Sequence, residues 1–123
     1  MEKKHEELLK NSKSGIILAA DVVSISALKK LVKIAIDVPE VLAVKVGFSL
    51  ALRFGLPRVV KSIKSISNLA VIYDHQKAAT DIPQTGGLFA EACYEAGVDG
   101  VIFFPQSGPK TLAGFVTAAL ERN

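Results

Sequence analysis

Three charged residues come at or near the ends of three apolar runs. Asp21 ends the first run, Lys45 lies near the end of the second, and Asp74 ends the third. If the runs are strands of one parallel sheet, their carboxyl ends share one rim and the three side chains converge there. One Asp at a strand end says little, because polar residues often end strands. Three such positions in succession predict a charged ligand site.

The segment that follows Asp74 adds a second concentration of ionisable groups. It places Lys77 between Asp74 and Asp81, so that one ammonium group and two carboxylates fall within eight residues. In a dry site, opposite charges keep one another ionised, and a lysine between carboxylates can act as a proton donor. The alternative interpretation is a solvated loop with ordinary charges.

The composition of the 123 residues favours one domain with an aliphatic core. Half of the residues are hydrophobic, 22% are charged, Trp is absent and the net charge is +3. This balance argues against a disordered chain, and so small and scattered a charge gives no reason to expect nucleic acid. No apolar run approaches the ~20 residues that span a bilayer, and the N-terminus has no apolar signal segment. Because Cys93 is the only cysteine, we expect no internal disulfide, no cysteine-rich zinc site, and a cytoplasmic protein.

Apolar runs alternate with amphipathic segments along the chain. The runs are 15–21, 41–46, 69–73 and 100–104. The main helical patterns are 26–37, 57–66, 88–96 and 109–120, with a short helix expected at 48–54. Continuous apolar runs of this kind are typical of strands buried on both faces. The alternation predicts an α/β protein with a parallel sheet and right-handed crossovers.

Two architectures fit four βα units. One is a small open sheet, and the other is half of a (βα)8 barrel, a fold that usually needs about 250 residues. No glycine-rich phosphate loop follows the first run, which lowers the case for a nucleotide-binding open sheet. We therefore expect residues 15–123 to form a (βα)4 half of a TIM barrel. Residues 1–14 are expected to form a polar segment or a short helix.

Three segments resemble those of orotidine 5′-phosphate decarboxylases, in an archaeal-like form. They are 17–21, 44–47 and 74–85, and the last is the most specific. The resemblance covers 15–123 and corresponds to the N-terminal half of that family's barrel. It implies decarboxylation of orotidine 5′-monophosphate to uridine 5′-monophosphate, the last step of pyrimidine nucleotide synthesis. It also implies a homodimer that needs neither cofactor nor metal.

The resemblance assigns a role to each charged residue. Asp74 would face the substrate carboxylate, and Lys77 would stabilise the carbanion at C6 and protonate it. Asp21 and Lys45 would hold the ribose hydroxyls and complete an alternating charge network with the catalytic pair. Asp81 would reach into the site of the partner subunit. The other substrate-binding residues are Ile82, Thr85 and Ser107, the last in a loop near the base.

The chain departs from the family pattern in two respects. The usual spacing is Asp-x-Lys-x-x-Asp, whereas here each gap is one residue longer and His75 and Gln76 fill the first gap. Asp74 and Lys77 therefore have opposite strand parity and converge only if the chain bulges or turns after Asp74. His75 could contact a ligand or support a residue that does, although such a histidine more often packs or faces solvent. The second departure is that the phosphate grip of the family comes from later barrel segments, for which 106–108 is the nearest candidate here.

Two other interpretations stay open beside an incomplete decarboxylase. One is a relative such as 3-hexulose-6-phosphate synthase, which uses magnesium on the rim, although the Ile82–Pro83 sequence argues against it. The other is a non-catalytic half-barrel that acts as an assembly unit. A four-stranded parallel sheet has two unpaired edges, and unpaired edges favour association into an oligomer.

Overall fold

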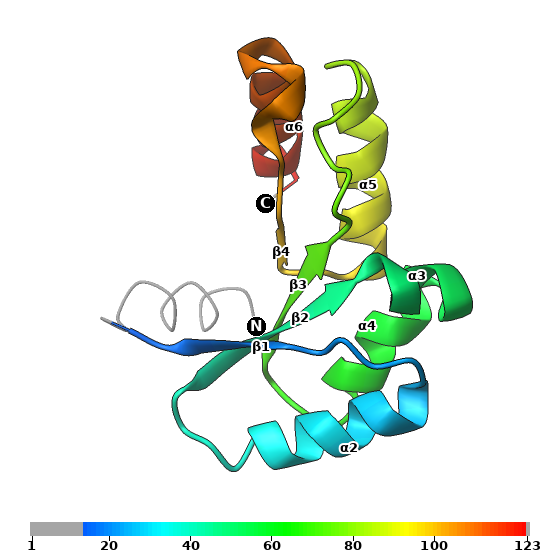
Figure 1. Cartoon of the computed structure of the whole chain (residues 1–123), viewed down its shortest axis with the longest axis vertical. Coiled ribbons are helices and arrows are strands. Elements are labelled where there is room, and N and C mark those ends of the chain that lie inside the picture. The colour runs from blue at the N-terminus through cyan, green and yellow to red at the C-terminus, as the bar shows by residue number, and fades with distance from the viewer. Residues whose placement is uncertain (1–13, 123) are drawn as a thin grey trace.

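A computed structural model describes residues 14–122, in which four parallel strands form one sheet (Figure 1). Each strand pairs with the next in chain order. The strands are β1 (Ile16–Ala19), β2 (Val41–Gly47), β3 (Ala70–Asp74) and β4 (Gly100–Val101). The connecting helices are α2 (Ile25–Ala35), α3 (Phe48–Phe54), α4 (Leu56–Lys64), α5 (Thr85–Ala96), η1 (Pro105–Ser107, a 3-10 helix) and α6 (Pro109–Leu120). The predicted alternation is confirmed, whereas the expectation for residues 1–14 falls almost wholly outside the described residues.

Local sequence signals explain where the helices begin and end. The Ser24 hydroxyl accepts a hydrogen bond from the Ala27 N–H at 3.1 Å and caps α2. Pro57 and Pro109 occupy first-turn positions of α4 and α6, where a missing N–H costs nothing. Gly97 ends α5 in the left-handed conformation, with φ of 78°.

The helices form a layer against one face of the sheet. α2 packs against α4, α4 against α5, and α5 against α6. Gly86 lets the last pair approach closely, because a Cβ atom there would lie 3.0 Å from the Gly114 carbonyl oxygen. The buried core between helices and strands includes Leu28, Val32, Val44, Val46, Val59, Ile63 and Val71. Since side chains alternate along a strand, Lys45 and Asp74 lie on the opposite face.

Two expectations about the strands are wrong. The run 15–21 was expected to be buried on both faces, but the Ile16 and Ile17 side chains are 50% and 53% exposed. The reason is that β1 is an edge strand with only β2 beside it. The run 100–104 gives a strand of only two residues, since the chain after β3 leaves the sheet and the Phe104 N–H donates to the loop carbonyl of Ala78.

No helix in the described part of the chain is both long and apolar enough to cross a membrane.

Candidate active site

The carboxyl ends of β2 and β3 bring Lys45 and Asp74 together. In the ladder, Lys45 is level with Ile72 and Gly47 is level with Asp74. Lys45 Nζ lies 2.9 Å from Asp74 Oδ2, which makes both a hydrogen bond and an ion pair. The lysine side chain is 25% exposed and the aspartate side chain 8%. The parallel register therefore produces a charge pair at the rim that the sequence pattern predicted.

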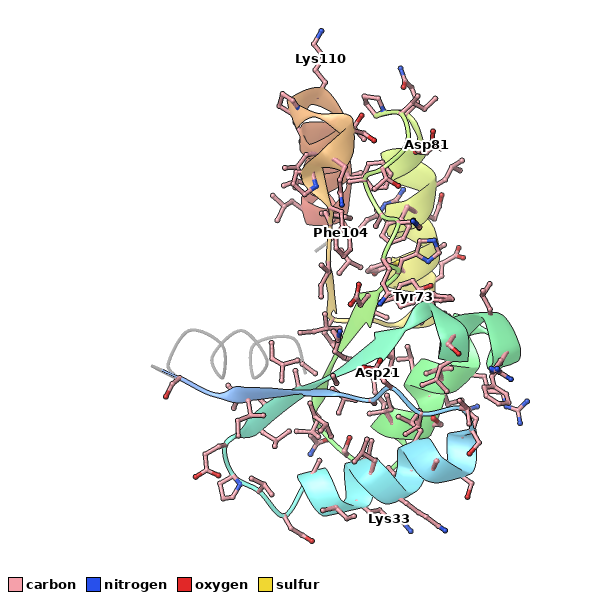
Figure 2. All side chains as sticks on the ribbon, viewed as in Figure 1. Asp21, Lys33, Tyr73, Asp81, Phe104 and Lys110 are labelled. Atoms are coloured by element: carbon pink, nitrogen blue, oxygen red, sulfur yellow. The ribbon has the colours of Figure 1, made fainter. Side chains whose placement is uncertain are left out.

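Asp21 joins this pair from β1. Figure 2 shows Asp21 where the chain leaves β1 toward α2. The chain is held there by the Ala20 N–H, which donates to the Lys45 carbonyl at 2.9 Å. A Cβ atom at Gly47 would lie 3.7 Å from Asp21 Oδ1, so the carboxylate lies over the end of β2. We call Asp21, Lys45 and Asp74 the rim triad.

The carboxylates of the triad raise the pKa of Lys45 above its ordinary value of 10.5. The largest cause is the hydrogen bond to Asp74, which outweighs the lowering by desolvation. The negative charges of Asp74 and Asp21 raise the pKa further. Lys45 is therefore a fixed positive charge at neutral pH.

Asp74 carries one oxygen atom whose hydrogen-bonding capacity is unused. Its Oδ1 atom is buried and has no hydrogen-bond partner among the described residues. Buried polar atoms are ordinarily paired, and leaving one unpaired costs about 1–3 kcal/mol. The Oδ1 atom is therefore an acceptor at the rim that is available to a further donor.

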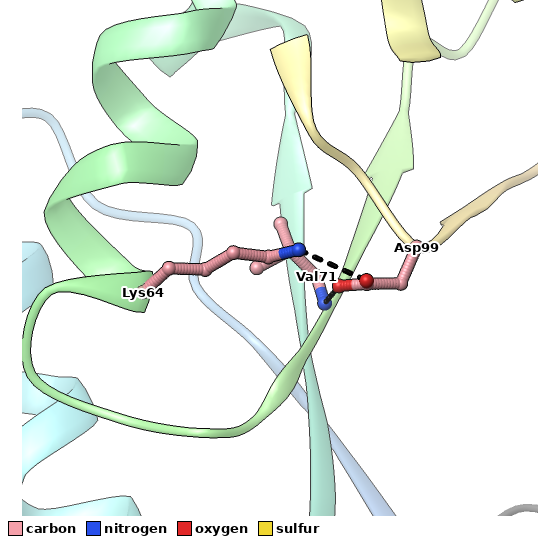
Figure 3. A network of polar contacts seen from close by, with 3 residues as sticks. All are labelled: Lys64, Val71 and Asp99. Carbon is pink, nitrogen blue, oxygen red and sulfur yellow. Dashed lines mark hydrogen bonds and ion pairs between the residues drawn. The ribbon is translucent and has the colours of Figure 1, made fainter. Parts of the chain in front are cut away.

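Asp99 at the opposite end of the sheet provides the contrast (Figure 3). Its Oδ1 accepts from Lys64 Nζ at 2.9 Å, and its Oδ2 accepts from the Val71 N–H at 2.8 Å. Both oxygens are therefore engaged, and the residue ties the turn before β4 to the start of β3. Each aspartate pairs with its own lysine at a distance of 2.9 Å. Of the two, only Asp74 has an oxygen atom without a partner among the described residues.

The structure does not bring Lys77 or Asp81 to the rim triad. Both side chains are exposed, and within residues 14–122 no hydrogen bond or ion pair joins either of them to the triad. The turn that parity requires is present, since Gln76 and Ala79 have φ of 65° and 64°. Asp81 lies at the far end of this loop near the start of α6, away from Asp21 (Figure 2).

The remaining residues predicted to bind substrate are Ile82, Thr85 and Ser107. Thr111 Oγ1 donates to the Asp81 carbonyl at 3.0 Å and holds the loop against α6. The Ile82 side chain is 55% exposed, and Thr85 Oγ1 donates to the Ile82 carbonyl at 2.8 Å. Ser107 is exposed in η1. They belong to the segments that follow β3 and β4, and no hydrogen bond in the described residues links them to the triad.

One contact near the site was not predicted from the sequence. Tyr73 Oη lies 2.7 Å from His75 Nδ1, so the residues on either side of Asp74 are hydrogen-bonded to each other. The signal that could have found it is spacing, because residues two apart in extended backbone share a face. The described residues contain no group of three or more His, Cys, Asp or Glu arranged to hold a metal ion.

Three groups have a raised pKa, from which we predict that the fold loses stability at alkaline pH. Burial raises the pKa of Cys93 from 9.0 to about 11 and that of Tyr73 from 10.0 to about 12, and Lys45 is also raised. A group with a raised folded-state pKa stabilises the fold fully below its unfolded pKa, and this contribution is lost as the pH rises through the folded pKa. We expect the urea midpoint to fall from about pH 9 upward, starting with Cys93.

The variant Cys93→Ala separates this effect from general alkaline damage. Its midpoint is expected to fall less steeply between about pH 9 and 11 than that of the unmodified chain, whatever its stability at pH 7. Equal slopes for the two proteins would contradict the assignment.

A parallel (βα)4 sheet with a charged triad at its carboxyl rim defines the class: half of a (βα)8-barrel enzyme. The family model described as "Orotidine 5′-phosphate decarboxylase / HUMPS family" matches residues 14–123. The chain belongs to this family.

Named relatives agree with that membership. The orotidine 5′-phosphate decarboxylase of Methanosarcina barkeri is 39% identical over 110 residues, which cover 89% of this chain and 46% of the relative. The crystal structure of orotidine 5′-monophosphate decarboxylase from Methanocaldococcus jannaschii superposes with a TM-score of 0.75 and 30% identity, over 88% of this chain and 50% of that one. The crystal structure of orotidine 5′-phosphate decarboxylase from Pyrococcus horikoshii superposes with a TM-score of 0.71 and 27% identity, over 84% of this chain and 48% of that one. The chain thus spans about half the length of these relatives and corresponds to the N-terminal half of their barrel.

Proposed function

We propose that this chain supplies the decarboxylating half of an orotidine 5′-phosphate decarboxylase site. The substrate is orotidine 5′-monophosphate, and the products are uridine 5′-monophosphate and CO2. The observation that carries the proposal is the Lys45–Asp74 pair at the rim, in which the buried Oδ1 of Asp74 is left for another contact. Family membership supports this chemistry over other uses of a charged barrel rim.

The reaction needs an anion and a cation on opposite sides of the bond that breaks. The Asp74 carboxylate lies against the substrate carboxylate, and departure of CO2 relieves the repulsion between them. The electron pair of the broken C6–carboxylate bond stays on C6. Lys77 stabilises this carbanion with its positive charge and then gives C6 a proton, which its amine regains from water.

The other predicted residues bind the substrate. Asp21 and Lys45 contact the ribose hydroxyls, since both lie at the carboxyl ends of strands beside Asp74. Asp81 and Ile82 are exposed at the far end of the loop that follows β3, and Asp81 lies far from Asp21 (Figure 2). This position supports a role in the site of a second subunit. Thr85 and Ser107 contribute to the ribose side and the base. The protein acts as a homodimer in pyrimidine synthesis, in the cytoplasm.

The test is decarboxylation of orotidine 5′-monophosphate, followed by absorbance, with two proteins. One is the purified 123-residue chain, and the other is a chimera that joins residues 14–123 to the remaining barrel of the Methanosarcina barkeri relative. Turnover by the chain alone or by the chimera supports the proposal, and the comparison shows whether the second half-barrel is required. Two folded proteins without turnover would overturn it.

The same assay separates this activity from that of metal-dependent relatives within the family. Turnover of the purified protein is expected to survive exhaustive treatment with EDTA. Loss of turnover with EDTA and recovery with magnesium would instead favour a metal-dependent reaction of the hexulose-phosphate synthase kind.

A further inference from the structure

The residues on either side of Asp74 face away from the rim triad. Tyr73 is level with Val101 of β4 and belongs to the buried core between sheet and helices. His75 has the same strand parity as Tyr73 and lies on the same side, whereas Asp74 points to the opposite face and meets Lys45. Asp74 therefore faces the rim, while the residues before and after it, Tyr73 and His75, are bound on the helix side of the sheet.

His75 is held there by a hydrogen bond and by aromatic packing. Its Nδ1 lies 2.7 Å from Tyr73 Oη, and the two ring centroids are 5.5 Å apart. The imidazole also packs against Phe89 of α5, with centroids 5.8 Å apart. Phe89 is in turn packed against Phe103 and Phe115, so the histidine is attached to the α5–α6 layer.

The attachment of His75 lies directly after the last paired residue of β3. The last paired position of β3 is Asp74, which is level with Gly47, and Gln76 turns the chain with φ of 65°. Asp74 is itself paired in the ladder, and the loop beyond it is held by the Phe104 N–H, which donates to the Ala78 carbonyl at 3.0 Å. Between these two points, the His75 side chain adds a contact with the helix layer directly after the ladder ends.

We propose that His75, through its hydrogen bond with Tyr73, is a positioning residue that orients the Asp74 carboxylate toward Lys45 and sets the direction of the Lys77 loop. The inference rests on the proposed function for its catalytic consequence, but the arrangement itself does not. The proposal assigns the Tyr73 hydroxyl as the donor of this 2.7 Å bond. Nδ1 of His75 accepts, and the ring proton is on Nε2.

Four variants isolate the hydrogen bond. Tyr73→Phe removes only the donor, and His75→Leu removes the acceptor while filling similar space. His75→Asn keeps an acceptor, since Oδ1 of asparagine is the same number of bonds from the backbone as Nδ1. The matched control is Tyr94→Phe, at an exposed tyrosine of α5.

The main measurement is the pKa of Lys45, read from the NMR titration of its side chain in the purified 123-residue chain. Tyr73→Phe and His75→Leu are expected to lower this pKa toward 10.5, because Asp74 is no longer held against the ammonium. His75→Asn and Tyr94→Phe are expected to keep it raised. In the unmodified chain, a long-range ¹H–¹⁵N spectrum of His75 is expected to show the proton on Nε2. A general loss of stability would not produce this pattern in variants shown by circular dichroism to be folded.

An unchanged Lys45 pKa in folded Tyr73→Phe and His75→Leu, or a ring proton on Nδ1, would overturn the proposal. These readings need no turnover, so they are independent of the proposed activity. In a protein that decarboxylates orotidine 5′-monophosphate, Tyr73→Phe and His75→Leu are expected to lower kcat by roughly 10- to 100-fold with KM little changed. His75→Asn is expected to recover most of that loss. Equal kcat for His75→Leu and His75→Asn would contradict the role of the acceptor.

Discussion

Replacing Lys77 with alanine is expected to lower kcat for orotidine 5′-monophosphate by at least about 10³-fold. Lys77 is the group proposed to face the carbanion, and it acts twice, as a fixed positive charge and as the proton donor. A preorganised charge of this kind usually supplies the largest catalytic contribution. Truncation to alanine removes both roles, and the loop 75–84 has no other lysine or arginine. The measurement is the absorbance assay with whichever protein turns over, the chain or the chimera.

The control for this prediction is an exposed lysine that lies far from the rim. Lys33 lies on the exposed surface of α2, well away from the loop that carries Asp81 (Figure 2). Lys33→Ala is expected to change kcat less than about twofold, because an exposed surface charge that is distant and screened by salt contributes little. If Lys77→Ala is folded and turns over at the rate of Lys33→Ala, another residue must donate the proton.

Replacing Lys45 with methionine is expected to lower the free energy of unfolding by about 2–3 kcal/mol at pH 7. Methionine keeps the aliphatic stem, so the loss comes from leaving the buried Asp74 carboxylate without its partner. The expected loss lies below the ~3–5 kcal/mol of a fully buried pair, because the lysine side chain is 25% exposed. Urea denaturation monitored by circular dichroism measures it.

Lys64→Met is the matched control, because it breaks an ion pair of the same 2.9 Å length at the other end of the sheet. The Lys64 side chain is 37% exposed, and Asp99 keeps its bond from the Val71 N–H, so the expected loss is under about 1 kcal/mol. Adding Asp74→Asn to Lys45→Met is expected to recover part of the larger loss, since a neutral amide needs no ammonium. Equal losses for the two lysines would show that the rim pair is an ordinary surface ion pair.

Much of the architecture was readable from the sequence because it depends on local patterns. The alternation of apolar runs and amphipathic segments predicted the βα order, and the helical pattern 109–120 has the bounds of α6. The convergence of Lys45 and Asp74 was also predictable, since strand parity and the shared rim of a parallel sheet decide it. The resemblance to the decarboxylase family came from three short segments and is confirmed by the family match.

Other features depended on contacts between residues far apart in the chain or on what lies beside a strand. The exposure of β1 follows from its place at the sheet edge, which an apolar run does not reveal. The short β4 follows from the path of the loop after β3, because a strand needs a neighbour to pair with.

The sequence by itself determined which charged residues reach the rim, because a period of two residues along each strand assigns every side chain to a face. Only the tertiary structure decided which of them pair. In the described residues Lys45, and not Lys77, bonds to Asp74, since ladder register sets Lys45 beside β3. The packing of His75 against Phe89 of α5 likewise joins residues that no local pattern links. Packing between elements, and not the pattern within one, therefore determines the geometry on which the chemistry depends.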